Sequence, residues 1–289
     1  MRSVTTHSPR RRGDGSPETL QEAMADQLVG QPAAVSAIVP YVQMYQAGLS
    51  PDGRPAGVFL LLGPSGTGKT KTVETLAAAL HGSEKHVLKV DCGEFQLEHE
   101  VAKLIRAPPG YLGHRETHPM LSQARVNSVT SERSSLAIVL FDEIEKAAPS
   151  MTRLLLGVLD KGTLRLGDNN TVNFERTLIF MTSNLGAREM VQAMEPTFGF
   201  QGAARRGLAV ELEGHLEKIG MNAVRRKFAP EFVNRIDAVV TYQPLDEAAL
   251  GMIVELQLAQ LQQHINSRLG LRGFNLRVHE GAKRFLLTH

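Results

Sequence analysis

The sequence predicts an α/β fold in which a five-stranded parallel sheet is covered by helices on both faces. Its apolar runs are continuous rather than alternating and are separated by stretches with helical spacing, a pattern typical of strands buried on both faces. A glycine-rich segment joins the first of these runs to a helix, and polar side chains follow the third and fourth runs. Because ligands bind outside the carboxyl ends of the strands in such sheets, we expect this edge to carry the functional site.

The elements of the large domain are expected in a regular order. Two helices are expected within residues 20–47, because apolar residues recur at helical spacing and Gly30 followed by Pro32 marks a turn. Gly82 can end the helix after the glycine-rich segment in a left-handed cap. A turn at 167–170 between two short extended segments predicts a β hairpin. The five strands are expected at residues 58–62, 86–91, 136–141, 177–182 and 238–242.

A second, smaller domain is expected after Pro244, where the pattern changes. Asp246 can cap a long helix, a short strand is expected at 274–278, and another helix begins near Glu280. We therefore divide the chain into a disordered basic tail at 1–19, a large α/β domain at 20–244 and a small helical C-terminal domain at 245–289. This last domain is expected to be truncated. The apolar residues of its long helix fall on one stripe, formed by Leu250, Val254, Leu258, Leu261, Ile265 and Leu269.

Composition limits the classes of function. The 289 residues have a formal net charge of +2, which gives no bulk electrostatic argument for nucleic acid or an anionic membrane as partner. The single cysteine, Cys92, excludes an internal disulfide and is compatible with a reducing compartment. No apolar run approaches the roughly 20 residues that cross a bilayer, and the N-terminus lacks the apolar part of a secretory signal. We expect a soluble cytoplasmic protein.

The N-terminal residues are rich in Ser, Thr, Arg and Gly, with little apolar content to bury. We interpret them as a disordered tail. An organelle transit peptide would share the bias toward Arg and Ser, but Pro9, Gly13 and Gly15 would break its amphipathic helix.

The glycine-rich segment fits the phosphate-binding pattern G-x-x-x-x-G-K-[ST]. Its residues are Gly63-Pro64-Ser65-Gly66-Thr67-Gly68-Lys69-Thr70. Such a turn points backbone N–H groups at phosphate oxygens, and the helix N-terminus adds positive partial charge at the same place. We expect Lys69 to reach the β and γ phosphates of ATP and Thr70 to ligate Mg²⁺. The alternative is an ordinary glycine-rich turn between strand and helix.

Carboxylates at the end of the third strand complete the predicted site. Asp142 is assigned to hold Mg²⁺, and Glu143 to orient or deprotonate the attacking water. Asn184, which follows the fourth strand, offers an amide near the same water. The alternatives are a solvated acidic pair at a helix N-terminus and an asparagine that only forms a turn.

Six ordered motifs make the sequence resemble the Clp family of AAA+ ATPases, most like the second ring of ClpB-type disaggregases and ClpC-type unfoldases. They are Leu28-Val29-Gly30-Gln31, the glycine-rich segment, Ala107-Pro108-Pro109-Gly110-Tyr111-Leu112-Gly113, Leu140-Phe141-Asp142-Glu143-Ile144-Glu145-Lys146-Ala147, Met181-Thr182-Ser183-Asn184 and Phe228-Ala229-Pro230-Glu231-Phe232-Val233-Asn234-Arg235-Ile236-Asp237. The resemblance implies an AAA+ P-loop NTPase core and an ATP-hydrolysing unfoldase that threads polypeptide through the pore of a ring.

The resemblance also implies roles for single residues. The region of Leu28 and Val29 would contact adenine, Asn184 would be sensor 1, and Arg235 would be an arginine finger inserted into the site of the neighbouring subunit. This last role implies a homo-oligomeric ring, usually of six subunits. The alternative for Arg235 is a local ion pair with Glu231 or Asp237.

Two further segments concern partners. Tyr111 and Leu112 lie between glycines, and in related unfoldases such a tyrosine lines the pore and grips an unfolded polypeptide. A tyrosine buried in a tight turn is the alternative. Phe198, Gly199 and Phe200 stand where ClpC-like proteins carry a loop that docks on a Clp-type peptidase, and exposed phenylalanines favour either a partner or local burial.

The chain also departs from the family pattern. The sensor 2 motif, Gly-Ala-Arg, is not found late in the small domain, and only one ATPase module is present. Two other functions stay open, one because of the basic Arg10–Arg12 tail and the other because of the missing sensor 2. One is a nucleic-acid-remodelling AAA+ ATPase, disfavoured by the nearly neutral charge, and the other is an ATP-binding regulator without motor activity.

Overall fold

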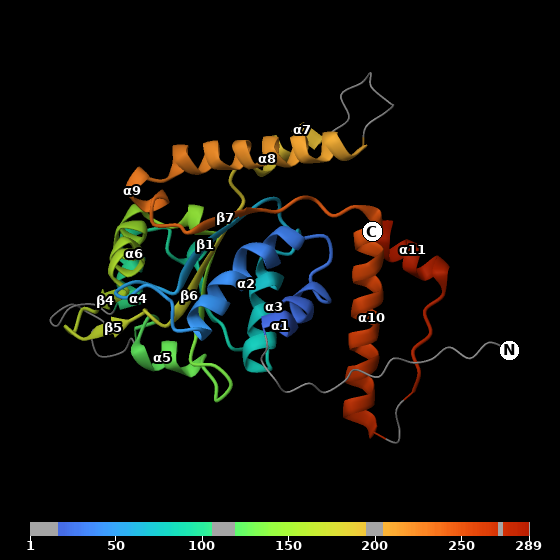
Figure 1. Ribbon diagram of the computed structural model, residues 1–289, viewed down its shortest axis with the longest axis horizontal. Coiled ribbons are helices and arrows are strands. Elements are labelled where there is room, and N and C mark those ends of the chain that lie inside the picture. Colours follow the sequence, from blue (N-terminus) through green and yellow to red (C-terminus); the bar gives the residue numbers. More distant parts are fainter. Residues whose placement is uncertain (1–16, 106–118, 195–204, 271–273, 289) are drawn as a thin grey trace.

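The structure is a computed structural model that describes residues 17–105, 119–194, 205–270 and 274–288 (Figure 1). The strands are β1 (Gly57–Leu62), β2 (Leu88–Asp91), β3 (Ala137–Asp142), β4 (Thr163–Arg165), β5 (Thr171–Asn173), β6 (Thr177–Ser183) and β7 (Ala238–Thr241). The helices are α1 (Pro17–Ala25), α2 (Pro32–Gln46), α3 (Lys69–His81), α4 (Glu98–Ile105), α5 (Gln123–Ser128), α6 (Pro149–Lys161), α7 (Ala187–Met194), α8 (Arg205–Lys227), α9 (Pro230–Val233), α10 (Glu247–Leu269) and α11 (Glu280–Thr288), with short 3-10 helices η1 (Cys92–Glu94) and η2 (Ile144–Lys146).

Five strands form a parallel sheet in the order β2-β3-β6-β1-β7, as the sequence predicts. All residues of β1 and β6 are buried, because these central strands are covered on both faces. The predicted hairpin is also confirmed, since β4 and β5 pair antiparallel across a turn in which Asn169 has a φ of 68°. The parallel arrangement brings the carboxyl ends of β1, β3 and β6 to one edge, next to the start of α3.

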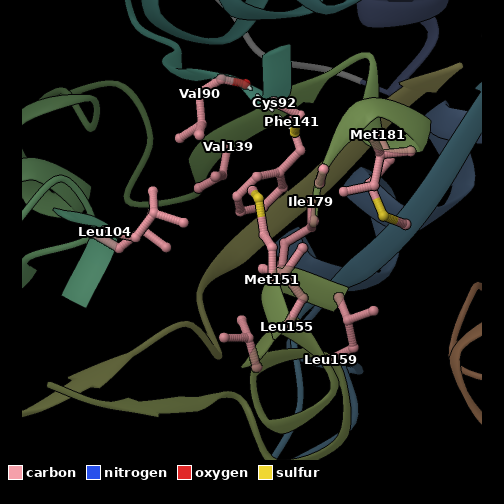
Figure 2. Close-up of a cluster of buried hydrophobic side chains, with 14 of the residues drawn as sticks. Val90, Cys92, Leu104, Val139, Phe141, Met151, Leu155, Leu159, Ile179 and Met181 are labelled. Carbon is pink, nitrogen blue, oxygen red and sulfur yellow. Dashed lines mark hydrogen bonds between the residues drawn. The ribbon is translucent and has the colours of Figure 1, made fainter. Parts of the chain in front are cut away.

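The core lies in two layers, one on each face of the sheet. Alternate residues of β1 enter different layers: Leu60 packs with α6, while Leu61 packs with α2 and α3. Figure 2 shows the first layer, where Met151, Leu155 and Leu159 of α6 face Phe141 and other side chains of the sheet. Burying each such side chain fully stabilises the fold by about 1.5 to 3 kcal/mol, so these two layers hold the site-bearing edge in place.

The ends of the helices follow the local sequence. Gly82 ends α3 with a φ of 83°, as expected, and the Oδ1 atom of Asp246 accepts a 2.7 Å hydrogen bond from the N–H of Ala249 at the start of α10. The predicted start of the first helix is wrong by three residues. It begins at Pro17 rather than at residue 20, because a proline is well tolerated in the first turn, where its missing N–H is not needed.

The C-terminal part contains one further correction. The strand expected at 274–278 is not formed, although the helices before and after it are. Its backbone is paired by a side chain instead: Gln262 of α10 donates to the carbonyl of Phe274 at 2.8 Å and accepts from the N–H of Leu276 at 2.6 Å. The predicted apolar stripe of α10 is also partly exposed to solvent, because another face of this helix, which includes Leu256, points toward the large domain.

Within the described ranges, we find no helix that combines the length and the apolar character needed to span a membrane.

Candidate functional site

The glycine-rich segment forms a loop between β1 and α3, where the sequence places it (Figure 1). Gly63 has a φ of 147°, and a Cβ atom built on it would lie 2.5 Å from the carbonyl oxygen of Tyr242. Gly68 has a φ of 96° at the start of α3. Only glycine fits the first position without displacing backbone, and the second needs a left-handed conformation that other residues rarely adopt. The loop therefore depends on these glycines for its shape.

Lys69 is 8% exposed and is enclosed by the loop that precedes it. Its Nζ atom donates to the carbonyls of Gly63 at 2.7 Å and Pro64 at 2.8 Å, and to Oδ1 of Asn184 at 2.9 Å. These three acceptors match the three N–H donors of an ammonium group. Burial lowers the pKa of Lys69, and the carboxylates of Glu145, Asp142 and Glu143 oppose that shift.

Asp142 ends β3 with its two carboxylate oxygens held by different side chains. Oδ1 accepts the hydroxyl of Thr182 at 2.5 Å, and Oδ2 lies 2.7 Å from Nζ of Lys89 on β2. Burial alone would raise the pKa of Asp142, but the hydrogen bonds from Lys89 and Thr182 outweigh it and hold the pKa below its usual value. Asp142 is therefore ionised at neutral pH, as a ligand of a cation must be.

Glu143 follows in a left-handed conformation, with a φ of 55°, which is uncommon for a residue other than glycine. Its N–H donates to Oγ1 of Thr182 at 2.9 Å, and its carboxylate receives Nδ2 of Asn184 at 3.2 Å and Nζ of Lys146 at 2.6 Å. Backbone strain of this kind persists only where the surroundings impose it and is concentrated at functional sites. Here it turns the carboxylate toward the phosphate loop.

Asn184 joins the two halves of the site. Its Oδ1 atom accepts from Lys69 and its Nδ2 atom donates to Glu143, so one amide bridges the phosphate loop and the end of β3. Its own N–H donates to Oε1 of Glu145 at 2.9 Å, which fixes the backbone that carries it. The predicted proximity of Lys69, Glu143 and Asn184 is therefore present in the structure.

A cavity of about 400 Å³ lies between these groups. Thr70 and Asp142 both line it, and a hydroxyl and an ionised carboxylate are the oxygen donors that Mg²⁺ prefers. The residues present therefore fit this metal. The full lining consists of Ser65, Gly66, Gly68, Lys69, Thr70, Lys71, Asp142, Glu143, Thr182 and Asn184.

A second cavity, of about 210 Å³, is lined by residues of the same loop, and Gly66 and Gly68 line both cavities. Leu28 and Val29 line it, together with Gly66, Thr67 and Gly68 of the loop and the apolar side chains of Leu245, Ile253 and Leu256. An apolar cavity beside a phosphate loop has the character of a site for a planar base. The structure thus has Leu28 and Val29 next to the loop, and their contact with adenine stays a prediction.

Arg235 lies apart from these cavities. It follows α9, and its guanidinium is 2.9 Å from Oδ1 of Asp160 on α6. The alternative of a local ion pair with Glu231 or Asp237 is wrong, because the partner lies on another helix and Asp237 accepts instead from Arg54 at 2.6 Å and from the N–H of Val58 at 2.9 Å. Arg235 does not line either cavity of its own chain.

The predicted pore residues Tyr111 and Leu112, and the predicted docking residues Phe198, Gly199 and Phe200, lie outside the described residues.

Sequence reasoning missed several side chains that shape the site. Thr182 and Lys89 hold Asp142, the buried hydroxyl of Tyr242 donates to Oγ1 of Thr72 at 2.7 Å, and the buried amide of Gln31 contacts the phosphate loop. For Thr182 and Gln31, the available signal was their place in the six motifs: Thr182 lies two positions before Asn184, and Gln31 lies two positions after Val29.

Loss of the Thr182 hydroxyl should destabilise the fold. Thr182→Val removes the donor to Asp142 and the acceptor for the N–H of Glu143 at a position that is 1% exposed. We expect the free energy of unfolding to fall by about 1 to 3 kcal/mol, measured by urea denaturation. Thr182→Ser keeps the hydroxyl and should therefore lose less stability than the valine variant. Equal stability of wild type and Thr182→Val would contradict this role.

The fold and the site together define a P-loop α/β protein in which a helical C-terminal part covers one side of the phosphate loop. The chain belongs to the AAA domain family, Cdc48 subfamily, whose sequence profile matches residues 54–239.

The relatives are Clp-type proteins, which confirms the predicted resemblance. The chain is 38% identical over 267 residues to the chaperone protein ClpB of Nitratidesulfovibrio vulgaris, covering 92% of this chain and 28% of that protein. It is similar to Hsp104 in the closed-state reconstruction of Hsp104:ATPγS and FITC casein, with a TM-score of 0.75, 28% identity and coverage of 94% of this chain and 43% of that one. For the S. cerevisiae Hsp104:casein complex in its extended conformation, the TM-score is 0.77 at 27% identity, with 96% and 44% covered. The chain thus spans less than a third of the length of the ClpB relative.

Proposed function

We propose that this protein is an ATP-hydrolysing AAA+ ATPase that remodels or unfolds other proteins. One observation carries the proposal: Lys69, Asp142, Glu143 and Asn184 line one cavity at the phosphate loop, and the same loop also lines a second, apolar cavity suited to a base. The first cavity offers the charges that a triphosphate requires, and the second offers the surfaces that a purine requires.

We propose a task for each of these groups in hydrolysis. Lys69 would exchange its contacts with loop carbonyls for β and γ phosphate oxygens, and Glu143 would accept a proton from the attacking water. Asn184 would orient that water, because its amide already links Lys69 and Glu143. Thr70 and Asp142 would hold Mg²⁺, which would neutralise charge on the phosphates.

The position of Arg235 supports a ring. A guanidinium offers fixed, planar donors to phosphoryl oxygens, yet Arg235 lies outside the cavities of its own chain and pairs with Asp160, where both side chains are exposed to solvent. We infer that it serves the site of a neighbouring subunit, so that the protein acts as a homo-oligomeric ring, with six subunits as the expected number.

The substrate is proposed to be unfolded polypeptide. Hsp104, to which this chain is similar, was solved with casein, and Tyr111 and Leu112 would supply the grip in the pore. We also propose that a Clp-type peptidase docks on Phe198, Gly199 and Phe200. We propose a cytoplasmic location as well, because the single cysteine, Cys92, is buried and free, which is compatible with a reducing compartment.

The test is the rate of ATP hydrolysis with and without unfolded casein. We expect casein to stimulate the wild type, and Tyr111→Ala to keep its basal rate but lose the stimulation. Tyr111→Phe is the matched control, because it retains the aromatic face and should still respond. An unchanged response of Tyr111→Ala would refute the role of Tyr111. ATP binding without turnover would favour a regulator, and salt-sensitive DNA binding would favour a nucleic-acid motor.

A further inference from the structure

Gln31 links three parts of the molecule that are distant in sequence. Its side chain is buried, and its Nε2 atom donates to the carbonyl of Thr67 at 3.1 Å and to the carbonyl of Gln243 at 2.9 Å. Thr67 lies in the phosphate loop. Gln243 lies in the connection at residues 242–246, which leads from β7 to α10 and is called the linker below. A single amide therefore joins the loop and the linker to the turn that precedes α2.

The linker is held by hydrogen bonds at Tyr242, its first residue, and packs closely against the turn before α2 at Leu245. Tyr242 donates its N–H to the carbonyl of Leu62 at 2.6 Å and its hydroxyl to Thr72 of α3 at 2.7 Å. Leu245 lies against the turn before α2, since a Cβ atom built on Gly30 would be 3.0 Å from Cδ2 of Leu245, and the φ of Gly30 is +75°. Between these two points, the linker is held to the phosphate loop through Gln31.

The linker determines where α10 lies. Figure 1 shows α10 at the side of the molecule, beside α1 and α3 and reached from β7 through the linker. Leu245 of the linker and Ile253 and Leu256 of α10 line the apolar cavity opposite Leu28 and Val29. A shift of the linker would therefore widen or narrow that cavity.

We propose that Gln31 is a positioning residue that couples the conformation of the phosphate loop to the orientation of α10. The two N–H groups of a planar amide point in fixed directions, so both carbonyls are satisfied only in one relative placement of loop and linker. A ligand that moves the peptide of Thr67 must also move the linker or leave a buried carbonyl unpaired. The coupling deepens the proposed function, because it rests on nucleotide binding at the loop.

The test compares hydrogen exchange of the linker and the first turn of α10 in wild type and Gln31→Met, each with and without ATPγS and Mg²⁺. Methionine keeps the length and suits a buried position but cannot donate. In the free variant we expect exchange at residues 243–250 to be about tenfold faster than in wild type, in line with the loss of two hydrogen bonds. ATPγS should change this exchange in wild type, while the variant should bind ATPγS without that response.

Two further variants separate coupling from general loosening. Gln46→Met makes the same replacement at an exposed position of α2 and should behave as wild type. Tyr242→Phe removes the hydroxyl that donates to Thr72 but leaves both bonds of Gln31 and the bond from Thr72 to the carbonyl of Gly68, so it should keep the response to ATPγS. The proposal is overturned if Gln31→Met responds as wild type does, or if Tyr242→Phe loses the response equally.

Failure of the proposed function would be visible separately. If wild type does not bind ATPγS, the site assignment fails, but the two ligand-free proteins still show whether Gln31 holds the linker. Equal exchange in those two proteins would overturn the role of Gln31 even where ATPγS binds.

Discussion

Glu143→Gln is expected to slow ATP hydrolysis by about 100- to 10,000-fold while ATP still binds. Glutamine has nearly the same shape as glutamate. Asn184 and Lys146 donate to different oxygens of Glu143, and the single amide oxygen of glutamine can keep one of these two hydrogen bonds. What it cannot do is take a proton from water. The rate of phosphate release and the affinity for a fluorescent ATP analogue, measured on the same preparation, separate the two effects.

A matched control removes a carboxylate elsewhere. Glu189 is exposed on α7, so Glu189→Gln should hydrolyse ATP at the rate of wild type. If Glu143→Gln retained more than about a tenth of the wild-type rate, Glu143 would not be the general base. The next acidic candidate would then be Glu145, which already accepts the N–H of Asn184.

Arg235→Ala is expected to lower hydrolysis by about 1,000- to 100,000-fold, the range found where an arginine finger is removed. The variant should fold normally, because the ion pair of Arg235 with Asp160 is exposed and such pairs contribute little to stability. Thermal unfolding and nucleotide affinity should therefore stay close to wild type while the rate falls.

Mixing the two inactive variants tests whether Arg235 acts across a subunit boundary. A Glu143→Gln subunit still carries Arg235, and an Arg235→Ala subunit still carries an intact Glu143. Adjacent in a ring, they would restore some complete sites, so the mixture should hydrolyse ATP faster than either variant alone. No recovery on mixing, with assembly of both variants verified by sedimentation, would refute action in trans.

The parallel sheet and the phosphate loop were predictable because their signals are local. Val58 to Leu62 form one continuous apolar run, and the glycines, Lys69 and Thr70 follow within eight residues. The placement of Asp142 at the ligand edge followed from the same logic, since a polar residue after a buried strand must lie at the end of that strand.

The supporting contacts were not predictable in this way. Gln31 contacts Gln243 across 212 positions, and Tyr242 contacts Thr72 across 170, so no spacing rule could pair them. The prediction of a strand at 274–278 was wrong for a related reason. Apolar residues made a strand plausible there, but the side chain of Gln262, rather than a neighbouring strand, satisfies the backbone of Phe274 and Leu276.

The three hydrogen bonds that Lys69 makes within its own loop bear on how fast nucleotide can leave. A lysine whose N–H groups had no acceptors within the protein would gain more binding free energy from a phosphate and would release it more slowly. Here each phosphate oxygen would replace an acceptor that Lys69 already has, at Gly63, Pro64 or Asn184. Binding at this residue would therefore be an exchange of partners, and the departing product would leave behind a lysine that is again fully hydrogen-bonded. We expect product release to be correspondingly rapid, which would suit the proposed unfoldase, because that function requires many cycles of hydrolysis on one polypeptide.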